Sequence, residues 1–147
     1  MRVAVGADIN GLAMKEAVRR HLLEAGHEVV DYGISEGMDE DYPDVALPAA
    51  RAVASGEVER AVLVCGTGLG MAIVANKVRG VRAAPVSDPY SAERAMKSND
   101  ARVLCLGGKV IGIDVAILLV DHWLASDFAG GASARKVAKI VALDVDP

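Results

Sequence analysis

The sequence predicts an α/β fold in which about five parallel strands alternate with helices. Composition is the first reason, because 52% of the residues are hydrophobic but only 3% are aromatic. A core of Ala, Val, Ile and Leu is typical of parallel sheets covered by helices. The second reason is that short apolar runs alternate regularly with segments of helical periodicity. Length is the third, since 147 residues suffice for one domain with a single core.

The expected elements follow one another in order along the chain. The first strand covers residues 2–8, a helix begins just after it, and Gly26 separates this helix from the second strand. The next helix begins near Pro43 and ends near Gly56. Later strands are expected over 60–65, 81–86 and 101–107, and later helices over 70–78, 88–99, 111–126 and about 132–143. Residues 1–147 are thus expected to form one domain, whose last helix packs on a partner subunit.

Polar residues follow several of the expected strands. In a parallel α/β sheet, ligands bind beyond the carboxyl ends of the strands. This rule gathers the following residues on one rim: Asp8, Cys65–Gly70, Ser87, Asp88 and Gly107–Lys109. We therefore look for the functional site at this rim.

The stretch CGTGLG at 65–70 has two interpretations. In the catalytic one, the backbone N–H groups around Gly66, Gly68 and Gly70 and the start of the next helix stabilise an oxyanion. The same field favours the thiolate of Cys65, which can remove a proton from a carbon beside a carbonyl. In the other, the glycines form a tight turn and Cys65 is a core residue, as free cysteines often are. Cys105 is expected in the core.

Three further sets of side chains are open to two interpretations. Asp8 is either a carboxylate of the site or a cap of the following helix. Lys109 is either a group that holds an anion or a solvated surface lysine. The same alternatives apply to Arg135 and Lys136.

Several function classes are disfavoured. The net charge of −4 without a block of like charges gives no footprint for nucleic acid. We see neither a signal peptide nor an apolar span of about 18 residues, so no membrane association and a cytoplasmic location are expected. His21, His27 and His122 fall outside the rim, which disfavours a histidine base and a histidine-rich metal site. No cofactor is expected, and the first loop lacks a dinucleotide fingerprint.

Six stretches carry a resemblance to a known family. They are VAVGAD…G…K at 3–15, DYPDVA at 41–46, CGTGLGMAIVANKVRGVRAA at 65–84, SDPYSAERA at 87–95, ND at 99–100 and GGKVIG at 107–112. With these stretches the chain resembles the family of ribose-5-phosphate isomerase B and the two kinds of galactose-6-phosphate isomerase subunit. The resemblance runs nearly end to end, and the block at 65–84 is far more specific than a lone glycine motif.

The resemblance implies a metal-independent aldose–ketose isomerase with a Rossmann-like three-layer sandwich. It implies a homodimer or homotetramer with active sites at a subunit interface. The residue matching Cys65 moves a proton between C1 and C2 of a small-molecule sugar through a cis-enediolate, while the glycine loop holds the oxyanion. Thr67 matches a hydroxyl that relays protons, Asp8 and Asn99 match polar groups around the open-chain sugar, and Tyr42 matches a residue that lines the pocket.

The chain departs from the family's pattern at the groups that bind phosphate and open the sugar ring. Ile9 and Ser98 stand where the family usually has histidines, the first for phosphate and the second for ring opening. Lys109, Ala132 and Lys136 stand where it usually has arginines. Arginine grips phosphate in a bidentate fork that lysine cannot form, so the phosphate clamp is weakened.

These departures leave the substrate open. One explanation is a short acyclic substrate such as a tetrulose phosphate, which needs no ring opening. A second is an unphosphorylated sugar or uronate, and a third is one half of a hetero-oligomer, since GGKVIG resembles the cysteine-bearing galactose-6-phosphate isomerase subunit. The competing hypothesis from another class is a sugar-binding subunit without catalytic activity.

Overall fold

A five-stranded parallel sheet lies at the centre of the protein, in the order β2-β1-β3-β5-β4. The computed structural model describes residues 1–145. The strands are β1 (Arg2–Ala7), β2 (Glu28–Asp31), β3 (Arg60–Cys65), β4 (Ala83–Pro85) and β5 (Val103–Gly107). The helices are α1 (Leu12–Glu24), α2 (Tyr42–Ser55), α3 (Leu69–Ala75), α4 (Pro89–Asn99), α5 (Ile113–Leu124) and α6 (Ala132–Val141). The expected α/β class with five parallel strands is confirmed.

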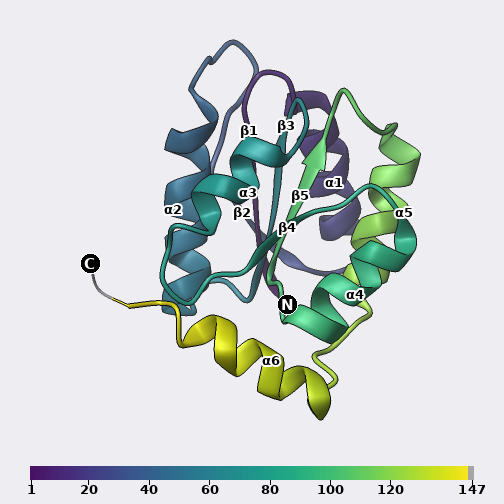
Figure 1. Ribbon diagram of the computed structural model, residues 1–147. Coiled ribbons are helices and arrows are strands. Elements are labelled where there is room, and N and C mark those ends of the chain that lie inside the picture. Colours follow the sequence, from purple (N-terminus) through teal and green to yellow (C-terminus); the bar gives the residue numbers. More distant parts are fainter. Residues whose placement is uncertain (146–147) are drawn as a thin grey trace.

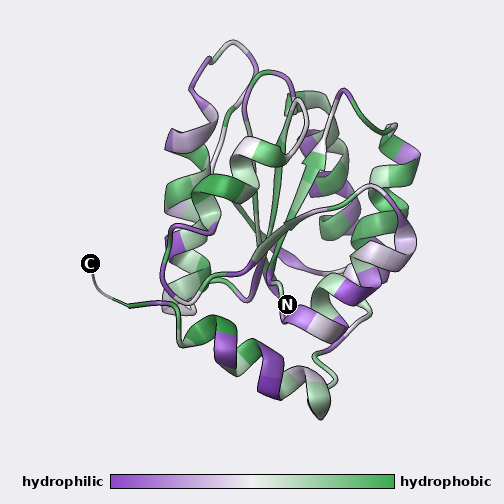
Figure 2. Ribbon diagram, in the orientation of Figure 1, coloured by the Kyte–Doolittle hydropathy of each residue, from purple (hydrophilic) through white to green (hydrophobic). Residues whose placement is uncertain are grey.

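Two layers of helices cover the two faces of the sheet (Figure 1). On one face α1, α4 and α5 pack on β1, β3 and β5, with Leu22 and Trp123 among the fully buried side chains. On the other face α2 and α3 pack on the same strands around Val45 and Met71. Beyond their first residues the central strands β1 and β3 are largely hydrophobic in Figure 2, because both of their faces are covered. This is the three-layer sandwich that the resemblance implies.

Several of the expected elements are shorter in the structure, and one residue explains the difference in α3 and β4. The helix expected over 70–78 is α3 (Leu69–Ala75), and the strand expected over 81–86 is β4 (Ala83–Pro85). Asn76 accounts for both differences, since its side-chain amide donates to the Ala83 carbonyl and its Oδ1 accepts from the Ala83 N–H, each at 2.9 Å. These bonds end α3 and fix the start of the edge strand. The hydrophobic periodicity of the sequence does not reveal such a tertiary contact, so the boundaries of α3 and β4 could not be predicted.

The sheet separates two ends of the molecule. The carboxyl ends of β1, β3 and β5 lie together at the upper edge in Figure 1, where the loops after them meet, whereas α6 crosses below the amino ends. The Ala129 N–H just before α6 donates to the Lys97 carbonyl near the end of α4, which ties α6 to this lower end. Among residues 1–145, no helix has the length and apolar character needed to cross a membrane.

Candidate active site

Cys65 lies at the carboxyl end of the central strand β3, all six residues of which are buried. Its side chain is 5% exposed and belongs to the face covered by α2 and α3. The Gly68 N–H donates to Cys65 Sγ at 3.1 Å. Gly68 has a φ of +80°, and a Cβ there would lie 3.0 Å from the Leu106 carbonyl carbon, so the turn requires glycine. The sulfur of Cys65 thus accepts a backbone hydrogen bond at the start of the glycine loop, and its catalytic role stays a prediction.

The other cysteine, Cys105, is a different kind of residue. It lies in β5 and is fully buried. Burial first, and the neighbouring Cys65 second, raise the pKa of the Cys105 thiol far above its ordinary value. Cys105 therefore stays a neutral thiol, which confirms its expected place in the core.

Asp8 closes the turn that leads into α1. Its Oδ1 accepts hydrogen bonds from the N–H groups of Asn10 at 2.9 Å and Gly11 at 3.2 Å. The Asp8 N–H in turn donates to the Val64 carbonyl at 3.3 Å, so the residue lies directly beside the end of β3. Asp8 therefore fixes the turn before α1 but does not cap the helix, whose N-cap is Gly11 without a side-chain cap bond. Its 8% exposed carboxylate lies at the rim.

The loops after β3 and β5 are joined side by side. The Gly108 N–H donates to the Cys65 carbonyl at 2.8 Å, and the Lys109 N–H donates to the Gly66 carbonyl at 3.0 Å. A Cβ on Gly66 would lie 3.6 Å from Lys109 Cδ and 3.8 Å from Asn10 Cβ. Lys109 and Asn10 therefore flank Gly66 from two sides, and both are exposed.

Thr67 is the exposed residue at the top of the glycine loop. Its Oγ1 accepts from the Leu69 N–H at 3.2 Å, which leaves the hydroxyl proton free to be donated outward. Gly107 packs against the Thr67 backbone so closely that a Cβ on Gly107 would lie 2.8 Å from Thr67 Cα. The loop after β5 thereby fixes the position of Thr67.

Tyr42 begins α2 and covers the start of α3. A Cβ on Gly70 would lie 2.6 Å from Tyr42 Cε2, so the ring rests directly on that glycine. The Tyr42 side chain is 39% exposed and borders the rim from the α2 side. The structure therefore brings together Asp8, Tyr42, Cys65, Gly66, Thr67, Gly68, Gly70 and Lys109.

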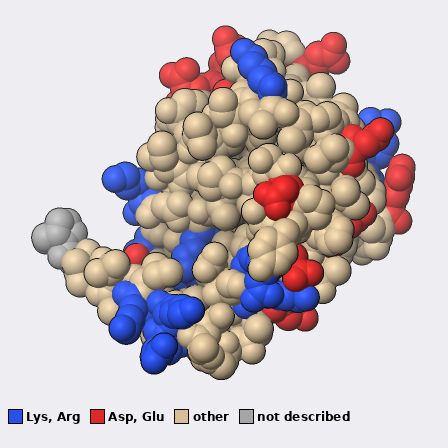
Figure 3. Space-filling model, turned by 45° about the vertical axis from the view of Figure 1, so that its right-hand side comes forward, with Lys and Arg blue, Asp and Glu red and all other residues tan. Residues whose placement is uncertain are grey.

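Four of the expected site residues lie at the other end of the sheet. Ser98 and Asn99 end α4, and the Asn99 carbonyl accepts from Arg82 Nε at 2.9 Å, next to the first residue of β5, Val103. The last residue of β5, Gly107, pairs with Cys65, so the strand separates the two places by about 13 Å. Arg135 and Lys136 are exposed on α6, where Lys and Arg side chains gather in Figure 3. Within one chain these four residues do not meet Cys65.

Asp88, which the sequence placed on the rim, acts as a helix cap. Its Oδ1 accepts from the Ser91 N–H at 2.8 Å at the start of α4, beyond the edge strand β4. Hydrogen bonds from Ser91 hold the pKa of the Asp88 carboxyl below its ordinary value. Strands β3 and β5 lie between β4 and β1, so Asp88 is separated from Asp8 along the rim.

The histidines lie away from the rim, as expected. His21 contacts Asp121 at 2.6 Å between α1 and α5, and His27 lies against the amino group of Met1 at the start of β2. His122 lies within α5. Within residues 1–145, no three His, Cys, Asp or Glu side chains are grouped as a metal ion would need.

Asn10 is the rim residue that sequence analysis missed. Its backbone oxygen would lie 2.5 Å from a Cβ on Gly108, so the loop after β1 crosses directly over the loop after β5. Ile9, beside it, is 53% exposed and also lines a cavity of about 750 Å³ between α1 and β2, together with Leu12 and Arg19. Neither Cys65 nor the glycine loop lines that cavity, so we do not include it in the candidate site.

Comparison with known proteins identifies this arrangement. A family model described as Ribose/Galactose Isomerase matches residues 3–140. The chain belongs to the ribose/galactose isomerase family. It is 44% identical over 144 residues to ribose-5-P isomerase B of Listeria innocua, covering 98% of this chain and 97% of that protein. It is 46% identical over 141 residues to D-erythrulose-4-phosphate isomerase of Pectobacterium atrosepticum, covering 95% and 93%.

A solved structure of this family has the same fold. Ribose-5-phosphate isomerase B of Clostridium thermocellum superimposes with a TM-score of 0.95 at 42% identity, covering 98% of this chain and 97% of that one. The expected family and the sandwich architecture are therefore confirmed. The chain is an aldose–ketose isomerase of the ribose-5-phosphate isomerase B type.

Proposed function

We propose that this family member interconverts a four-carbon ketose phosphate and its aldose, with Cys65 as the base. The observation that carries the proposal is the hydrogen bond from the Gly68 N–H to Cys65 Sγ at 3.1 Å, at the end of a buried strand and beside exposed Thr67. This geometry places a cysteine sulfur, a hydroxyl and backbone donors within one loop. Those are the groups that proton transfer through an enediolate needs.

The proposed reaction needs no co-reactant. The Cys65 thiolate removes a proton from C1 of the ketose, and the C1–H electrons form the C1–C2 double bond of the enediolate. The N–H groups of the glycine loop hold the negative oxygen, and the Thr67 hydroxyl moves a proton between O2 and O1. The Cys65 thiol then returns its proton to C2, which gives the aldose and restores the thiolate.

The substituted residues favour a short substrate. A ketose of four carbons with phosphate on O4 cannot close a five- or six-membered ring, so it needs no ring-opening histidine. Ser98 stands at that position, and its Oγ accepts from Arg94 Nε at 2.7 Å, which makes it a fixed polar group rather than a base. The naming of a 46% identical relative as a D-erythrulose-4-phosphate isomerase supports this substrate class. Lys109, beside Gly66, is the cation we assign to the phosphate.

A second copy of the chain completes the proposed site. Ser98, Asn99, Arg135 and Lys136 lie at the end of the sheet opposite Cys65, so they reach a Cys65 site only in a partner. Exposed apolar side chains on α5 and α6 offer surface for such an assembly, among them Ile113, Leu118, Ile140 and Val141. We propose a homodimer or homotetramer.

We also propose a cytoplasmic location for the enzyme. Both Cys65 and Cys105 are free thiols in the structure. A catalytic thiolate at Cys65 works in a reducing compartment, where it is protected from oxidation.

Substrate preference tests the proposal directly. We expect kcat/KM for D-erythrulose 4-phosphate to exceed that for ribose 5-phosphate by at least about tenfold, because the ring-opening group is absent. Unphosphorylated erythrulose separates the phosphorylated from the unphosphorylated alternative, and Ser98→His tests the ring-opening argument by raising activity on ribose 5-phosphate. Equal activity on both phosphates would overturn the proposed substrate. Activity only with a second kind of subunit would favour the hetero-oligomer.

Mixing inactive subunits tests the shared site. Cys65→Ala and Asn99→Ala each remove one half of it. If one site uses Cys65 of one chain and Asn99 of another, mixed dimers carry one intact site, and an equal mixture regains about a quarter of the wild-type activity. A mixture no more active than its two components would contradict the composite site.

A further inference from the structure

Asp100 follows α4 in a backbone conformation that is unusual for a residue other than glycine. Its φ is 47° and its ψ is 45°, and among residues 1–145 it is the non-glycine residue with a positive φ. Aspartate tolerates this left-handed region better than most residues, because its short side chain can bond locally. The chain reverses direction here, directly after Asn99 and before β5.

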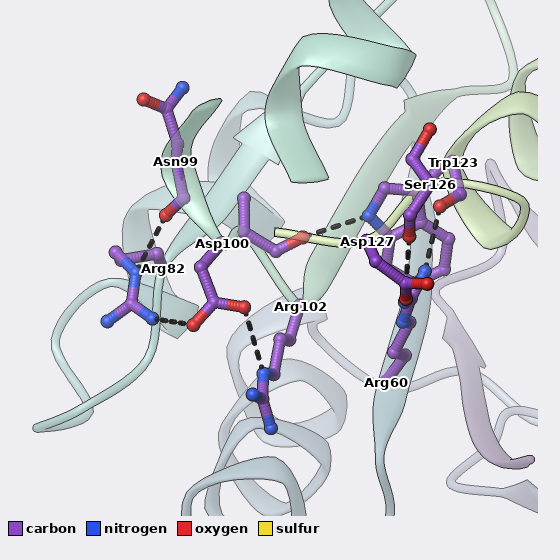
Figure 4. Close-up of polar contacts among 9 residues, drawn as sticks. Arg60, Arg82, Asn99, Asp100, Arg102, Trp123, Ser126 and Asp127 are labelled. Carbon is purple, nitrogen blue, oxygen red and sulfur yellow. Dashed lines mark hydrogen bonds and ion pairs between the residues drawn. The ribbon is translucent and has the colours of Figure 1, made fainter. Parts of the chain in front are cut away.

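The Asp100 carboxylate is held by arginines on both sides, as Figure 4 shows. Arg82 Nη2 lies 2.7 Å from Oδ2, with both side chains largely buried, and Arg102 Nε lies 3.1 Å from Oδ1. Arg82 also donates through Nε to the Asn99 carbonyl at 2.9 Å. One guanidinium therefore grips Asp100 and the backbone of Asn99 at the same time, in the fixed geometry that only arginine provides.

The segment is tied down from its other side as well. The Ala101 N–H donates to the Ala95 carbonyl at 2.9 Å, and the Ala101 carbonyl accepts from Trp123 Nε1 at 2.9 Å. These contacts hold both Asp100 and Ala101, so they restrict the backbone at the end of α4 to one conformation.

The Asn99 side chain differs from the rest of this segment, because no hydrogen bond within the described residues holds it. It is exposed, and in Figure 4 it points away from the Arg82–Asp100 pair. Within the described residues its amide group forms no hydrogen bond. A rigid backbone thus presents a free carboxamide outward.

We propose that the Arg82–Asp100 pair is a positioning device that aims the Asn99 carboxamide into the active site of a partner subunit. The inference rests on the proposed function, in which Asn99 serves a Cys65 site on another copy of the chain. Asp100 fixes the reversal of the chain, and Arg82 fixes the Asn99 carbonyl. These two constraints set the direction in which the Asn99 side chain points. Arg82 and Asp100 do not touch the substrate.

A positioned group loses much of its effect when it is displaced by about 1 Å. Because a small misplacement costs up to about 10²-fold in rate, we expect Asp100→Asn and Arg82→Lys each to lower kcat/KM between about 5- and 50-fold. Asp100→Asn keeps the shape and tolerates the left-handed backbone, so the variant should fold. Arg102→Gln is the matched control, since Arg102 also pairs with Asp100 but does not bond Asn99. It should change kcat/KM less than about twofold.

A double-mutant cycle with Asn99→Ala separates positioning from general support. If Asp100 acts through Asn99, then Asp100→Asn on the Asn99→Ala background causes no further loss beyond about twofold. If the losses multiply instead, or if Asp100→Asn is as active as the wild type, the proposal is wrong. Full activity of Asn99→Ala would also overturn it, while leaving the proposed reaction intact.

Hydrogen exchange gives a readout that does not depend on turnover. We expect the amides of Asp100 and Ala101 to exchange faster in Asp100→Asn and Arg82→Lys than in the wild type and Arg102→Gln. Unchanged exchange would overturn the proposal even if activity falls. A wild-type protein that turns over no sugar phosphate would refute the proposed function, and the exchange comparison would still decide whether the pair fixes the segment.

Discussion

Lys15 ties α1 to the loop after β2 through a buried ammonium group. Its side chain is 0% exposed, and Nζ lies 2.8 Å from Asp31 Oδ2, 2.9 Å from Glu16 Oε1 and 2.7 Å from the Ile34 carbonyl oxygen. Lys15→Met keeps most of the volume but removes every donor. Breaking a buried ion pair costs about 3–5 kcal/mol, and the partial exposure of both carboxylates reduces this, so we expect a loss of about 2–4 kcal/mol in the free energy of unfolding.

Thermal unfolding at fixed protein concentration measures this loss. For a chain of this size, 2–4 kcal/mol corresponds to a fall in Tm of roughly 6–13 °C. Lys97→Met is the matched control, because Lys97 is 39% exposed and lies 3.4 Å from Glu93, so it should cost less than about 1 kcal/mol. Lys15→Met with Asp31→Asn should recover part of the loss, since no unpaired carboxylate remains. A Tm for Lys15→Met no lower than that of Lys97→Met would show that the buried ammonium stabilises the fold no more than a surface lysine does.

Two further predictions concern Tyr42 and Asp88. A Cβ on Gly70 would lie 2.6 Å from the Tyr42 ring, so Gly70→Ala should displace the ring and raise KM, whereas Gly112→Ala, where a Cβ meets nothing within 4 Å, should leave KM unchanged. Steady-state kinetics of both variants check this, and equal KM values would contradict the assigned role of Tyr42. Hydrogen bonds from Ser91 lower the pKa of Asp88 in the folded state. The ionised carboxylate therefore stabilises the folded protein fully at pH values above its ordinary pKa of 3.8, and this stabilisation is lost as the pH falls through the lowered pKa of the folded state. Asp88→Asn should therefore flatten the acid side of the stability profile in urea unfolding, and an unchanged profile would contradict the capping role.

An element of the fold could be predicted where its own residues show an apolar pattern with clear boundaries. β3 reads as a strand because Arg60–Cys65 is apolar beyond its first residue and is bounded by polar and glycine residues. The short edge strand β4 could not be bounded, because Asn76 fixes its start through hydrogen bonds across a turn. The ion pair of Asp100 with Arg82 likewise joins residues 18 positions apart, so no local pattern in the sequence predicts it.

The site was predictable to the extent that topology determines it. The rule for parallel sheets brings Asp8, Cys65 and Lys109 to one edge, and the structure shows them there. Asn10 was missed because its place depends on how one loop crosses another. The role of Asn99 came from the resemblance alone. The predicted helix over 88–99 and strand over 101–107 already place it at the amino end of the sheet, opposite Cys65, and the structure shows it there.

The proposed reaction requires Cys65 to move a proton at the carbon beside the carbonyl of a four-carbon ketose phosphate. Incorporation of solvent deuterium at that carbon can be followed by NMR in D₂O with D-erythrulose 4-phosphate. We expect exchange with the wild type and with Cys105→Ala, and a loss of exchange of at least about 10²-fold with Cys65→Ala in a folded protein. Exchange that persists in Cys65→Ala, or that never occurs in the wild type, would show that Cys65 is not the base of this reaction.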